Sequence, residues 1–316
     1  MDLQDKRLLV TGGAGLIGSP LVSRLAGDNE VTVVDNLSNG SRASLPEDIE
    51  FVEGDITDEA VVADVVTDDL DAVFHLAADK YVNTDQPREQ MEVNETMTYN
   101  LLERMDEVGV ENILFTSSST VYGEAPRPTP EDYAPLEPIS VYGVTKLAEE
   151  GLLSVYAHSH DFTVWNFRFA NIVGPRYGAG VVPDFVYKLR EDPDSLTILG
   201  DGRQEKSYMH VEGCVDAMCH VVEHARADMN TFNLGTRTTT SVTRIADIVS
   251  DEMGIDPDYE YTGGDRGWTG DVPKMRLSIE KLAALGWEPS LSSDESVRQG
   301  VRDVLSEPEN EPHLSI

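Results

Sequence analysis

The sequence predicts an α/β protein with a doubly wound parallel sheet and a smaller, mixed α/β second domain. Three observations support this prediction. Short runs of β-branched and apolar residues alternate with helical patterns through the first half of the chain, a glycine-rich turn follows the first run, and the alternation becomes irregular after Gly174. Alternating strands and helices are typical of a parallel sheet covered by helices on both faces.

The strands expected in the first half are mostly continuous apolar runs, as in a sheet buried on both faces. They span Arg7–Thr11, Glu30–Asp35, Glu50–Glu53, Ala72–His75, Asn112–Thr116 and Thr163–Arg168. The helices expected between them span Gly15–Ala26, Asp58–Val66, Arg88–Val108 and Val141–His158. In the second half we expect a strand at Leu196–Leu199 and helices near Glu212–Ala225 and Val242–Met253. The expected domains are 1–170, completed by about 211–236, which binds a dinucleotide, and 171–210 with 237–316, which binds the substrate.

The composition is strongly acidic. The chain has 58 Asp and Glu residues against 24 Lys and Arg residues, for a formal net charge of −34. Nucleic acid and anionic membranes are therefore not expected partners, because both attract positive protein surfaces. Acidic, lysine-poor surfaces are typical of proteins that stay soluble in multimolar salt, where repulsion is screened within about 3 Å. We expect a halophilic protein, with an unusually acidic mesophilic one as the alternative.

The start of the chain has no apolar stretch typical of a signal peptide, and no run of about 18 apolar residues occurs. Cys214 and Cys219 lie five residues apart in a helix-like run, which suits a disulfide poorly. They indicate buried thiols in a reducing compartment. We expect a cytoplasmic protein that does not enter a membrane.

The turn after the first strand predicts a dinucleotide site. Gly12, Gly15 and Gly18 let the backbone turn, approach a diphosphate closely and pack the next helix on the sheet. The N-terminus of that helix presents N–H groups to the diphosphate. Asp35 ends the following strand, where a carboxylate binds an adenosine ribose and repels a 2′-phosphate. Glycines also occur in ordinary turns, but this context favours NAD.

Tyr142 and Lys146 lie four residues apart at the start of an expected helix, so they share a face. Bringing the pKa of a phenol from near 10 to near 7 needs about 4 kcal/mol in favour of the phenolate. An adjacent ammonium and a cationic nicotinamide supply such stabilisation. This spacing is often only a surface pair, but residues 117–120 lie at the carboxyl edge of the sheet, where ligands bind. The pattern predicts Tyr142 as a base assisted by Lys146.

With these motifs the chain resembles the extended short-chain dehydrogenases, specifically the nucleotide-sugar epimerases, and among them particularly the archaeal UDP-galactose 4-epimerases. The resemblance covers about residues 6–290. It rests on TGGAGLIGS (11–19), VVDNLSNG (33–40), GDI (54–56), HLAA (75–78), SSSTVYG (117–123), YGVTK (142–146), RFANIVGPR (168–176), GDGRQEKSYMHV (200–211) and GDRGWTGDVP (264–273). It implies a Rossmann fold and the NAD-dependent interconversion of UDP-glucose and UDP-galactose through a transient 4-keto intermediate.

The resemblance also implies roles for individual residues. Ser118 matches the catalytic Ser or Thr, Tyr142 the base, and Lys146 the residue that binds the nicotinamide ribose. Lys80 matches a lysine that only some relatives use on the NAD phosphates, a solvated lysine being the alternative. The implied cofactor-binding set comprises Gly12, Gly15, Leu16, Ile17, Gly18, Asp35, Asn36, Asp55, Ile56, Leu76, Ala77, Ala78, Lys80, Asn94, Tyr142 and Lys146.

For the UDP-sugar, the resemblance implies that Asn171 contacts the diphosphate and that Ser118 contacts the sugar. Arg266 and Asp271 match an arginine for the substrate phosphate and an aspartate for its ribose, although the segment between them is longer than in the common pattern. Lys206 stands where many relatives have an arginine. The lysine offers the phosphate a point charge in place of the bidentate fork of a guanidinium group. The alternative for both cations is pairing with surface carboxylates.

Competing functions remain open at the level of the sequence. A 4,6-dehydratase is disfavoured because Ser119 and Thr120 stand where such relatives carry Asp and Glu. A 4-keto reductase or an epimerase for UDP-glucuronate or a UDP-N-acetylhexosamine stays possible, and Met275, near the position that gates 2-acetamido sugars, does not decide. A non-catalytic NAD sensor on the same fold is less favoured. No metal is expected, since His220 and His224 lack a metalloprotease pattern.

The resemblance further implies a homodimer in which two helices of each subunit, Arg88–Val108 and Val141–His158, form a four-helix bundle. The first helix has a stripe suited to this, although the same stripe is compatible with packing on the sheet. The stripe comprises Met91, Thr98, Leu101, Leu102 and Met105.

Overall fold

The computed structural model describes residues 1–80, 85–176, 178, 180–267 and 270–307 of the chain. The chain forms two compact units. Unit 1 comprises Met1–Val121, Val141–Arg168 and Val215–Phe232, and unit 2 comprises Tyr122–Ser140, Phe169–Cys214 and Asn233–Ile316. Residues 122–140, expected in the first domain, thus cluster with unit 2.

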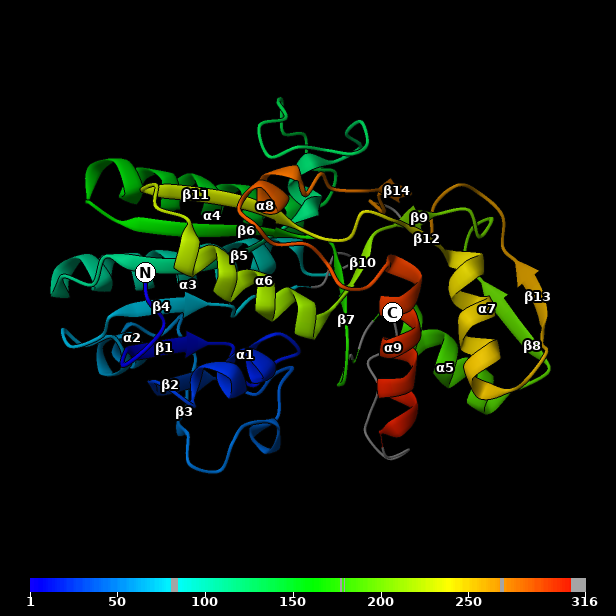
Figure 1. The fold of residues 1–316 in the computed structure, drawn as a ribbon, viewed down its shortest axis with the longest axis horizontal. Coiled ribbons are helices and arrows are strands. Elements are labelled where there is room, and N and C mark those ends of the chain that lie inside the picture. The colour runs from blue at the N-terminus through cyan, green and yellow to red at the C-terminus, as the bar shows by residue number, and fades with distance from the viewer. Residues whose placement is uncertain (81–84, 177, 179, 268–269, 308–316) are drawn as a thin grey trace. The chain divides into compact units, whose positions relative to one another are not determined.

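Unit 1 contains a seven-stranded sheet with strand order β11-β6-β5-β4-β1-β2-β3 (Figure 1). Neighbouring strands from β5 to β3 pair in parallel. The strands are β1 (Arg7–Thr11), β2 (Glu30–Asp35), β3 (Glu50–Glu53), β4 (Ala72–His75), β5 (Asn112–Ser118), β6 (Thr163–Phe169) and β11 (Met229–Leu234). The order reverses between β1 and β4, which is the topological switch point of a doubly wound sheet. The predicted fold class is confirmed.

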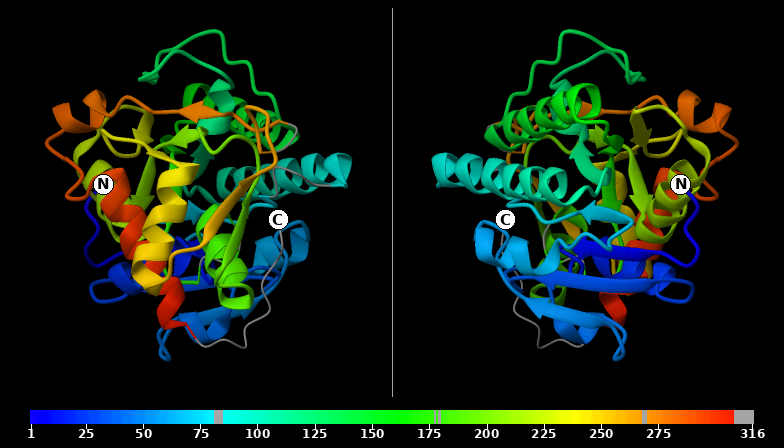
Figure 2. Two further views of the ribbon diagram at one scale, coloured as in Figure 1. Left: turned by 90° about the vertical axis from the view of Figure 1, so that its right-hand side faces the viewer. Right: turned by 90° about the vertical axis from the view of Figure 1, so that its left-hand side faces the viewer.

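Helices cover both faces of this sheet (Figure 2). They are α1 (Gly18–Leu25), α2 (Glu59–Val65), α3 (Pro87–Val108), α4 (Val141–Ser159) and α6 (Val211–His224), with 3₁₀ turns η1 (Arg42–Ser44) and η2 (Ser119–Tyr122). α1 and α6 share one face, where Arg24 of α1 pairs with Asp216 of α6 at 3.7 Å. α1 begins at Gly18 rather than at the predicted Gly15, because the residues between them form the glycine-rich turn.

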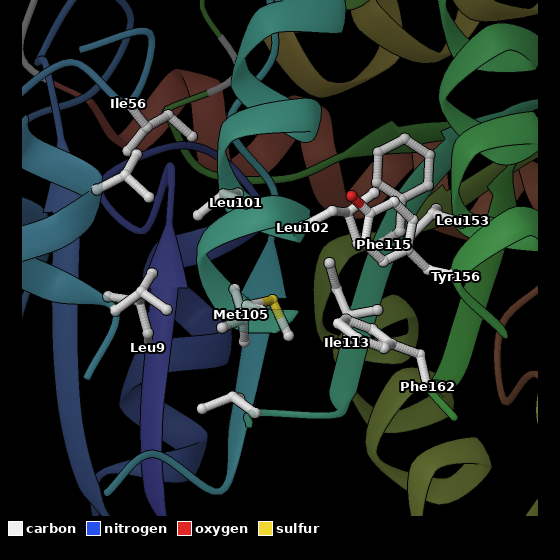
Figure 3. Close-up of a cluster of buried hydrophobic side chains, with 14 of the residues drawn as sticks. Leu9, Ile56, Leu101, Leu102, Met105, Ile113, Phe115, Leu153, Tyr156 and Phe162 are labelled. Carbon is white, nitrogen blue, oxygen red and sulfur yellow. The ribbon is translucent and has the colours of Figure 1, made fainter. Parts of the chain in front are cut away.

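The opposite face carries the apolar core of unit 1, in which α2, α3 and α4 pack on the sheet. Figure 3 shows Leu101, Leu102 and Met105 of α3 beside Ile113 and Phe115 of β5. Four of the five residues in the predicted dimer stripe of α3 are fully buried in the unit, and only Met91 is exposed. This stripe therefore packs on the sheet, as the sequence alternative allowed.

Unit 2 consists of small sheets and a helical cluster. Its strands are β7 (Asn171–Val173), β8 (Ser195–Ile198), β9 (Glu205–Lys206), β10 (Tyr208–His210), β12 (Thr240–Ser241), β13 (Asp258–Tyr261) and β14 (Lys274–Met275). They form the pairs β10-β7 and β13-β8 and the three-stranded sheet β12-β9-β14. Its helices are α5 (Val181–Glu191), α7 (Val242–Met253), α8 (Glu280–Ala284) and α9 (Ser293–Ser306). α5, α7 and α9 share one apolar core.

Within the described part of the chain, no helix is long and apolar enough to span a membrane. Both cysteines are buried and neither forms a disulfide, as predicted.

Candidate active site

The glycine-rich turn between β1 and α1 has a backbone that side chains would obstruct. Gly12 has φ +66°, and a Cβ there would lie 2.6 Å from the backbone N of Ala77. A Cβ at Gly18 would lie 2.3 Å from the carbonyl oxygen of Gly12, whereas one at Gly15 would lie 3.3 Å from the same atom. The turn is thus an open backbone cradle at a helix N-terminus, which fits a dinucleotide diphosphate.

Asp35, at the end of β2, lies against this cradle. Its carboxylate accepts hydrogen bonds from the backbone N–H of Ala14 at 2.9 Å and of Leu37 at 2.8 Å. The structure therefore brings together the carboxylate and the glycine turn predicted for the adenosine half of the cofactor. Leu16 and Ile17, in the same turn, are half-buried.

Asn36 and Asp55 form a second, more exposed pair beside β2. The Asn36 amide donates to Asp55 Oδ2 at 3.1 Å, and Thr57 donates to Oδ1 from its N–H and its hydroxyl. Burial raises the pKa of Asp55, but these hydrogen bonds outweigh it and hold the pKa below its usual value. Ile56 is buried with its side chain in the unit 1 core, so only its backbone is available for the cofactor contact that the resemblance implies.

The segment after β4 lies against the glycine turn through Leu76 and Ala77. Asn94 of α3 fixes this segment, since its Oδ1 accepts from Asp79 N–H at 2.8 Å and its Nδ2 donates to Asp79 O at 3.0 Å. Asn94 is fully buried, so the structure gives it a scaffolding role toward the cofactor segment. Ala78 is half-buried and Lys80 is exposed on this segment.

Ser118 ends β5 at the carboxyl edge of the sheet. Its hydroxyl oxygen accepts hydrogen bonds from the N–H and the hydroxyl of Thr120, at 3.2 and 3.0 Å, which leaves its own proton for donation. The preceding Ser117 donates to the buried Glu150 of α4 at 2.5 Å. Glu150 also pairs with Arg168 of β6 at 2.7 Å, so the end of β5 is tied to its neighbours.

Tyr142 and Lys146 lie on the first turns of α4, as predicted. The Lys146 side chain is 1% exposed, and its Nζ lies 4.5 Å from the ring centroid of Phe115 and 6.0 Å from that of Tyr142. Burial raises the pKa of the Tyr142 phenol, and the carboxylates of Glu149 and Asp79 raise it further. Lys146 is therefore buried and Tyr142 half-buried, so the two do not form an exposed surface pair.

Unit 2 contains the residues predicted to bind the UDP group. Lys206 Nζ lies 2.6 Å from Oδ1 of the buried Asp271, and Arg266 pairs with Glu124 and donates to the backbone oxygen of Asp271. Asn171 begins β7, and its N–H donates to the carbonyl oxygen of Ser207 at 3.2 Å. Both predicted cations thus have carboxylate partners in this structure. Trp268 and Thr269, between Arg266 and Asp271, lie outside the described residues.

The sequence patterns did not predict three residues of this site, namely Gly13, Thr98 and Glu149. A Cβ on Gly13 would lie 2.6 Å from Val33, which its place within the glycine run already signals. Glu149 is fully buried beside Lys146, and Thr98 of α3 donates to it at 2.7 Å. The three-residue spacing of Lys146 and Glu149 was visible in the sequence, but their burial was not.

The described residues contain no cluster of three or more His, Cys, Asp or Glu side chains able to hold a metal ion. His220 and His224 stack with ring centroids 4.1 Å apart, and the His224 ring bonds to the carbonyl oxygen of His220. This pair is a feature of one turn of α6.

The sequence matches the NAD dependent epimerase/dehydratase family over residues 8–235. It is 33% identical over 310 residues to the UDP-glucose 4-epimerase of Mycolicibacterium smegmatis, with 93% of this chain and 97% of that protein covered. It is 30% identical over 302 residues to an archaeal homologue of UDP-glucose 4-epimerase from Methanocaldococcus jannaschii, with the same coverages.

Solved structures show the same relationship. A UDP-galactose 4-epimerase superposes with a TM-score of 0.86 at 38% identity, covering 95% of this chain and 98% of that one. The Thermotoga maritima UDP-glucose 4-epimerase with UDP-glucose gives 0.86 at 34% identity, covering 94% and 98%. The UDP-N-acetylglucosamine 4-epimerase of Methanobrevibacter ruminantium gives 0.86 at 28% identity, covering 96% and 99%. The chain therefore belongs to the NAD dependent epimerase/dehydratase family, and NAD is its cofactor.

Proposed function

We propose that the protein interconverts UDP-glucose and UDP-galactose by inverting C4 of the sugar through a transient 4-keto sugar. The observation that carries this proposal is the buried Lys146 ammonium beside the Tyr142 and Phe115 rings, on the helix that follows β5. The similarity to UDP-glucose and UDP-galactose 4-epimerases over 93–95% of the chain supports the choice of sugar.

Tyr142 removes the proton of the sugar 4-hydroxyl as a phenolate, and Ser118 donates a hydrogen bond to the same oxygen. Bound NAD supplies the hydride acceptor and donor for C4, together with a positive charge. Because burial, Glu149 and Asp79 all raise the pKa of Tyr142, the positive charges of Lys146 and the cofactor have to outweigh them for the phenolate to form. The same phenol returns the proton when the ketone is reduced.

Asn171, Lys206 and Arg266 bind the diphosphate of the substrate, and Asp271 binds its ribose. Lys206 and Arg266 are held by carboxylates in this structure, so a diphosphate has to replace Asp271 and Glu124 as their partner. Charge-assisted contacts to phosphate are strong enough for such an exchange.

Another nucleotide sugar is the main alternative substrate. Met275 is 8% exposed and pairs in register with Lys206 across β14 and β9, which supports a place for its side chain near the substrate. Methionine is flexible and adapts its volume, so it does not exclude UDP-glucuronate or UDP-N-acetylhexosamines. A 4-keto reductase would use the same Ser118, Tyr142 and Lys146, whereas a non-catalytic sensor has no need of them.

The test is to incubate the purified protein in high salt with UDP-galactose, UDP-glucuronate or UDP-N-acetylglucosamine separately, without added reductant, and to resolve the products. We expect conversion of UDP-galactose to UDP-glucose at the highest rate. Conversion of a different UDP-sugar and not of UDP-galactose would identify that sugar as the substrate. Product that forms only when a reductant is added would identify a reductase instead.

We also propose a homodimer formed through the outer faces of α3 and α4. Exposed apolar side chains gather there, Met91 and Tyr99 on α3 and Val144 and Val155 on α4. Val144 and Val155 lie about three helical turns apart and so share one face. Static light scattering in high salt checks the mass: Val155→Glu should yield monomers, while Leu199→Glu, at an exposed leucine of unit 2, should leave the dimer intact. A monomeric unmodified protein would contradict the dimer.

The two buried thiols outside any disulfide support a cytoplasmic location, because such a compartment keeps cysteines reduced. The net charge of −34 supports a working environment of high salt.

A further inference from the structure

The Lys146 ammonium has a buried carboxylate partner that the proposed mechanism does not use. Glu149 follows Lys146 by three residues on α4, and its side chain is fully buried. Lys146 Nζ lies 3.2 Å from Oε2 and 3.5 Å from Oε1 of Glu149. Removing a carboxylate from water is costly unless it is paired and hydrogen-bonded, so this position is constrained by more than packing.

A hydrogen-bond chain from the sheet holds Glu149 in place. Thr98 of α3 donates its hydroxyl proton to Glu149 Oε1 at 2.7 Å, and the same hydroxyl oxygen lies 3.0 Å from Nε2 of His75. Nδ1 of His75 lies 2.8 Å from the hydroxyl of Thr11. Since the Thr98 proton is used on Glu149, His75 donates from Nε2 and accepts from Thr11.

Among the described residues, only a few titratable groups act on this chain of hydrogen bonds. Burial lowers the pKa of His75 to about 3, and the Lys146 ammonium contributes, so the imidazole is neutral. The pKa of Glu149 is raised, first by burial and then by the negative charge of Glu95 on α3. The Lys146 ammonium and the hydrogen bond from Thr98 act in the opposite direction. On the side of Tyr142 the acidic neighbours are Glu149 and Asp79.

We propose that Glu149 is a positioning residue, which fixes the Lys146 ammonium by an ion pair and offsets part of its positive charge at Tyr142. This inference rests on the proposed roles of Tyr142 and Lys146. The carboxylate and the phenol belong to one helix seven residues apart, which corresponds to about 10 Å along the axis. At that separation and an effective dielectric constant near 20, one charge shifts an ionisation by about one pH unit.

The decisive variant is Glu149→Gln, because glutamine keeps the size of the side chain and the acceptor for Thr98 but removes the charge. The ultraviolet absorbance of tyrosinate is titrated for the protein and for Glu149→Gln, each with and without NAD. Each curve is corrected by its Tyr142→Phe counterpart, which isolates one phenol among the 11 tyrosines. We expect the ionisation of Tyr142 to move to lower pH by about one unit in Glu149→Gln.

Glu95→Gln is the matched control, because Glu95 is a half-buried carboxylate of α3 for which no contact with Lys146 occurs in the described structure. It should move the titration by less than about a third of that amount. An equal shift in both variants would indicate a general effect of lost negative charge and overturn the positioning role. An unchanged titration in folded Glu149→Gln would also overturn it, since Glu149 would then carry no charge at Tyr142.

Glu149→Met provides a second route if Glu149→Gln does not fold, because methionine fills a similar volume and removes the charge. The Tyr142 titration should then move to lower pH by about the same one unit. An unchanged titration in folded Glu149→Met would overturn the proposal. Because the readout is spectroscopic, it separates the two claims: a shift without epimerase activity refutes only the proposed function, and activity without a shift refutes only the role of Glu149.

Discussion

The candidate site residues of unit 1 and unit 2 hold their positive charges in different ways. In unit 1, Lys146 is 1% exposed, lies over aromatic rings and has its carboxylate partner on the same helix. In unit 2, Lys206 is 17% and Arg266 36% exposed, and their partners come from distant parts of the chain. The Lys146–Glu149 pair is fixed by its buried surroundings, whereas the exposed pair of Arg266 and Glu124 contributes little stability and exchanges easily. We therefore expect changes in unit 1 to affect the rate of reaction and changes in unit 2 to affect substrate affinity.

The largest expected effect belongs to Tyr142. Tyr142→Phe removes the proposed base without changing the bulk of the ring, so kcat should fall by about 10²–10⁴-fold while KM for UDP-galactose stays within about threefold. Steady-state kinetics in high salt measures both constants. Full turnover in Tyr142→Phe would end the assignment of chemistry to unit 1.

The glycine turn should show the next largest effect. A methyl group at position 18 lies 2.3 Å from a backbone oxygen, so Gly18→Ala should weaken NAD binding by about ten- to a hundredfold through backbone displacement. Gly15→Ala, with 3.3 Å to the same oxygen, should change it far less. Gly27→Ala is the control, because its Cβ meets nothing within 4 Å. Calorimetric NAD titration measures all three, and equal affinities for Gly15→Ala and Gly18→Ala would contradict the steric explanation.

In unit 2, Lys206→Met should raise KM for the UDP-sugar by about tenfold and leave kcat within about threefold, because a contact to a charged phosphate is lost in ground state and transition state alike. Asp271 would then be buried without its cation, so Lys206→Met/Asp271→Asn tests the same loss in a neutral pocket. Arg24→Met, which removes an exposed pair on α1, is the control. A fall in kcat alone would remove the distinction between the units.

The buried network of unit 1 should also be visible in stability. The pKa of His75 is lowered to about 3 by burial and then by Lys146, against about 6.5 when unfolded. Above pH 6.5 neither state binds the proton; as pH falls below 6.5 only the unfolded state does, so the folded state loses about 1.4 kcal/mol per pH unit down to about pH 3. Denaturant unfolding at several pH values should show this slope, reduced in His75→Gln but unchanged in His158→Gln, whose side chain is exposed. An unchanged slope in His75→Gln would place the acid sensitivity elsewhere.

Salt should give the smallest effect, and mainly in unit 2. Raising salt from low to molar concentration screens the surface carboxylates that repel a diphosphate, so the affinity for UDP should improve by a few-fold while the fold is intact. Equilibrium binding of UDP measures this. A steady loss of affinity with salt would mean that direct attraction to Lys206 and Arg266 dominates.

The sequence predicted the nucleotide-binding half of the fold closely. The first four strands begin and end at the predicted residues, because each is a short apolar run between polar segments. The helices α5, α8 and α9 were missed. The capping box of Ser292 and Glu295 marks the start of α9, but Gly300 interrupts its helical pattern, where the close approach of Val173 leaves little room for a side chain.

The candidate site divides along the same line. Gly12, Asp35, Tyr142 and Lys146 were predicted because each belongs to a local pattern at the end of a strand or the start of a helix, whereas the family resemblance singled out Ser118 from residues 117–120. The pairing of Lys206 with Asp271 joins residues 65 positions apart, and the burial of Glu149 depends on the packing of α3 on α4. Such contacts arise from tertiary structure, which no local pattern specifies.

The division of the chain into units has a consequence for how the protein can be taken apart. The chain passes from one unit to the other at residues 121/122, 140/141, 168/169, 214/215 and 232/233. Neither unit is a continuous stretch, so no single truncation releases one of them, and a nascent chain cannot complete the sheet of unit 1 until β11 has been made. With the substrate residues placed in unit 2 as proposed, recombination between relatives would have to exchange several segments together to transfer a substrate preference, which favours change by point substitution within unit 2.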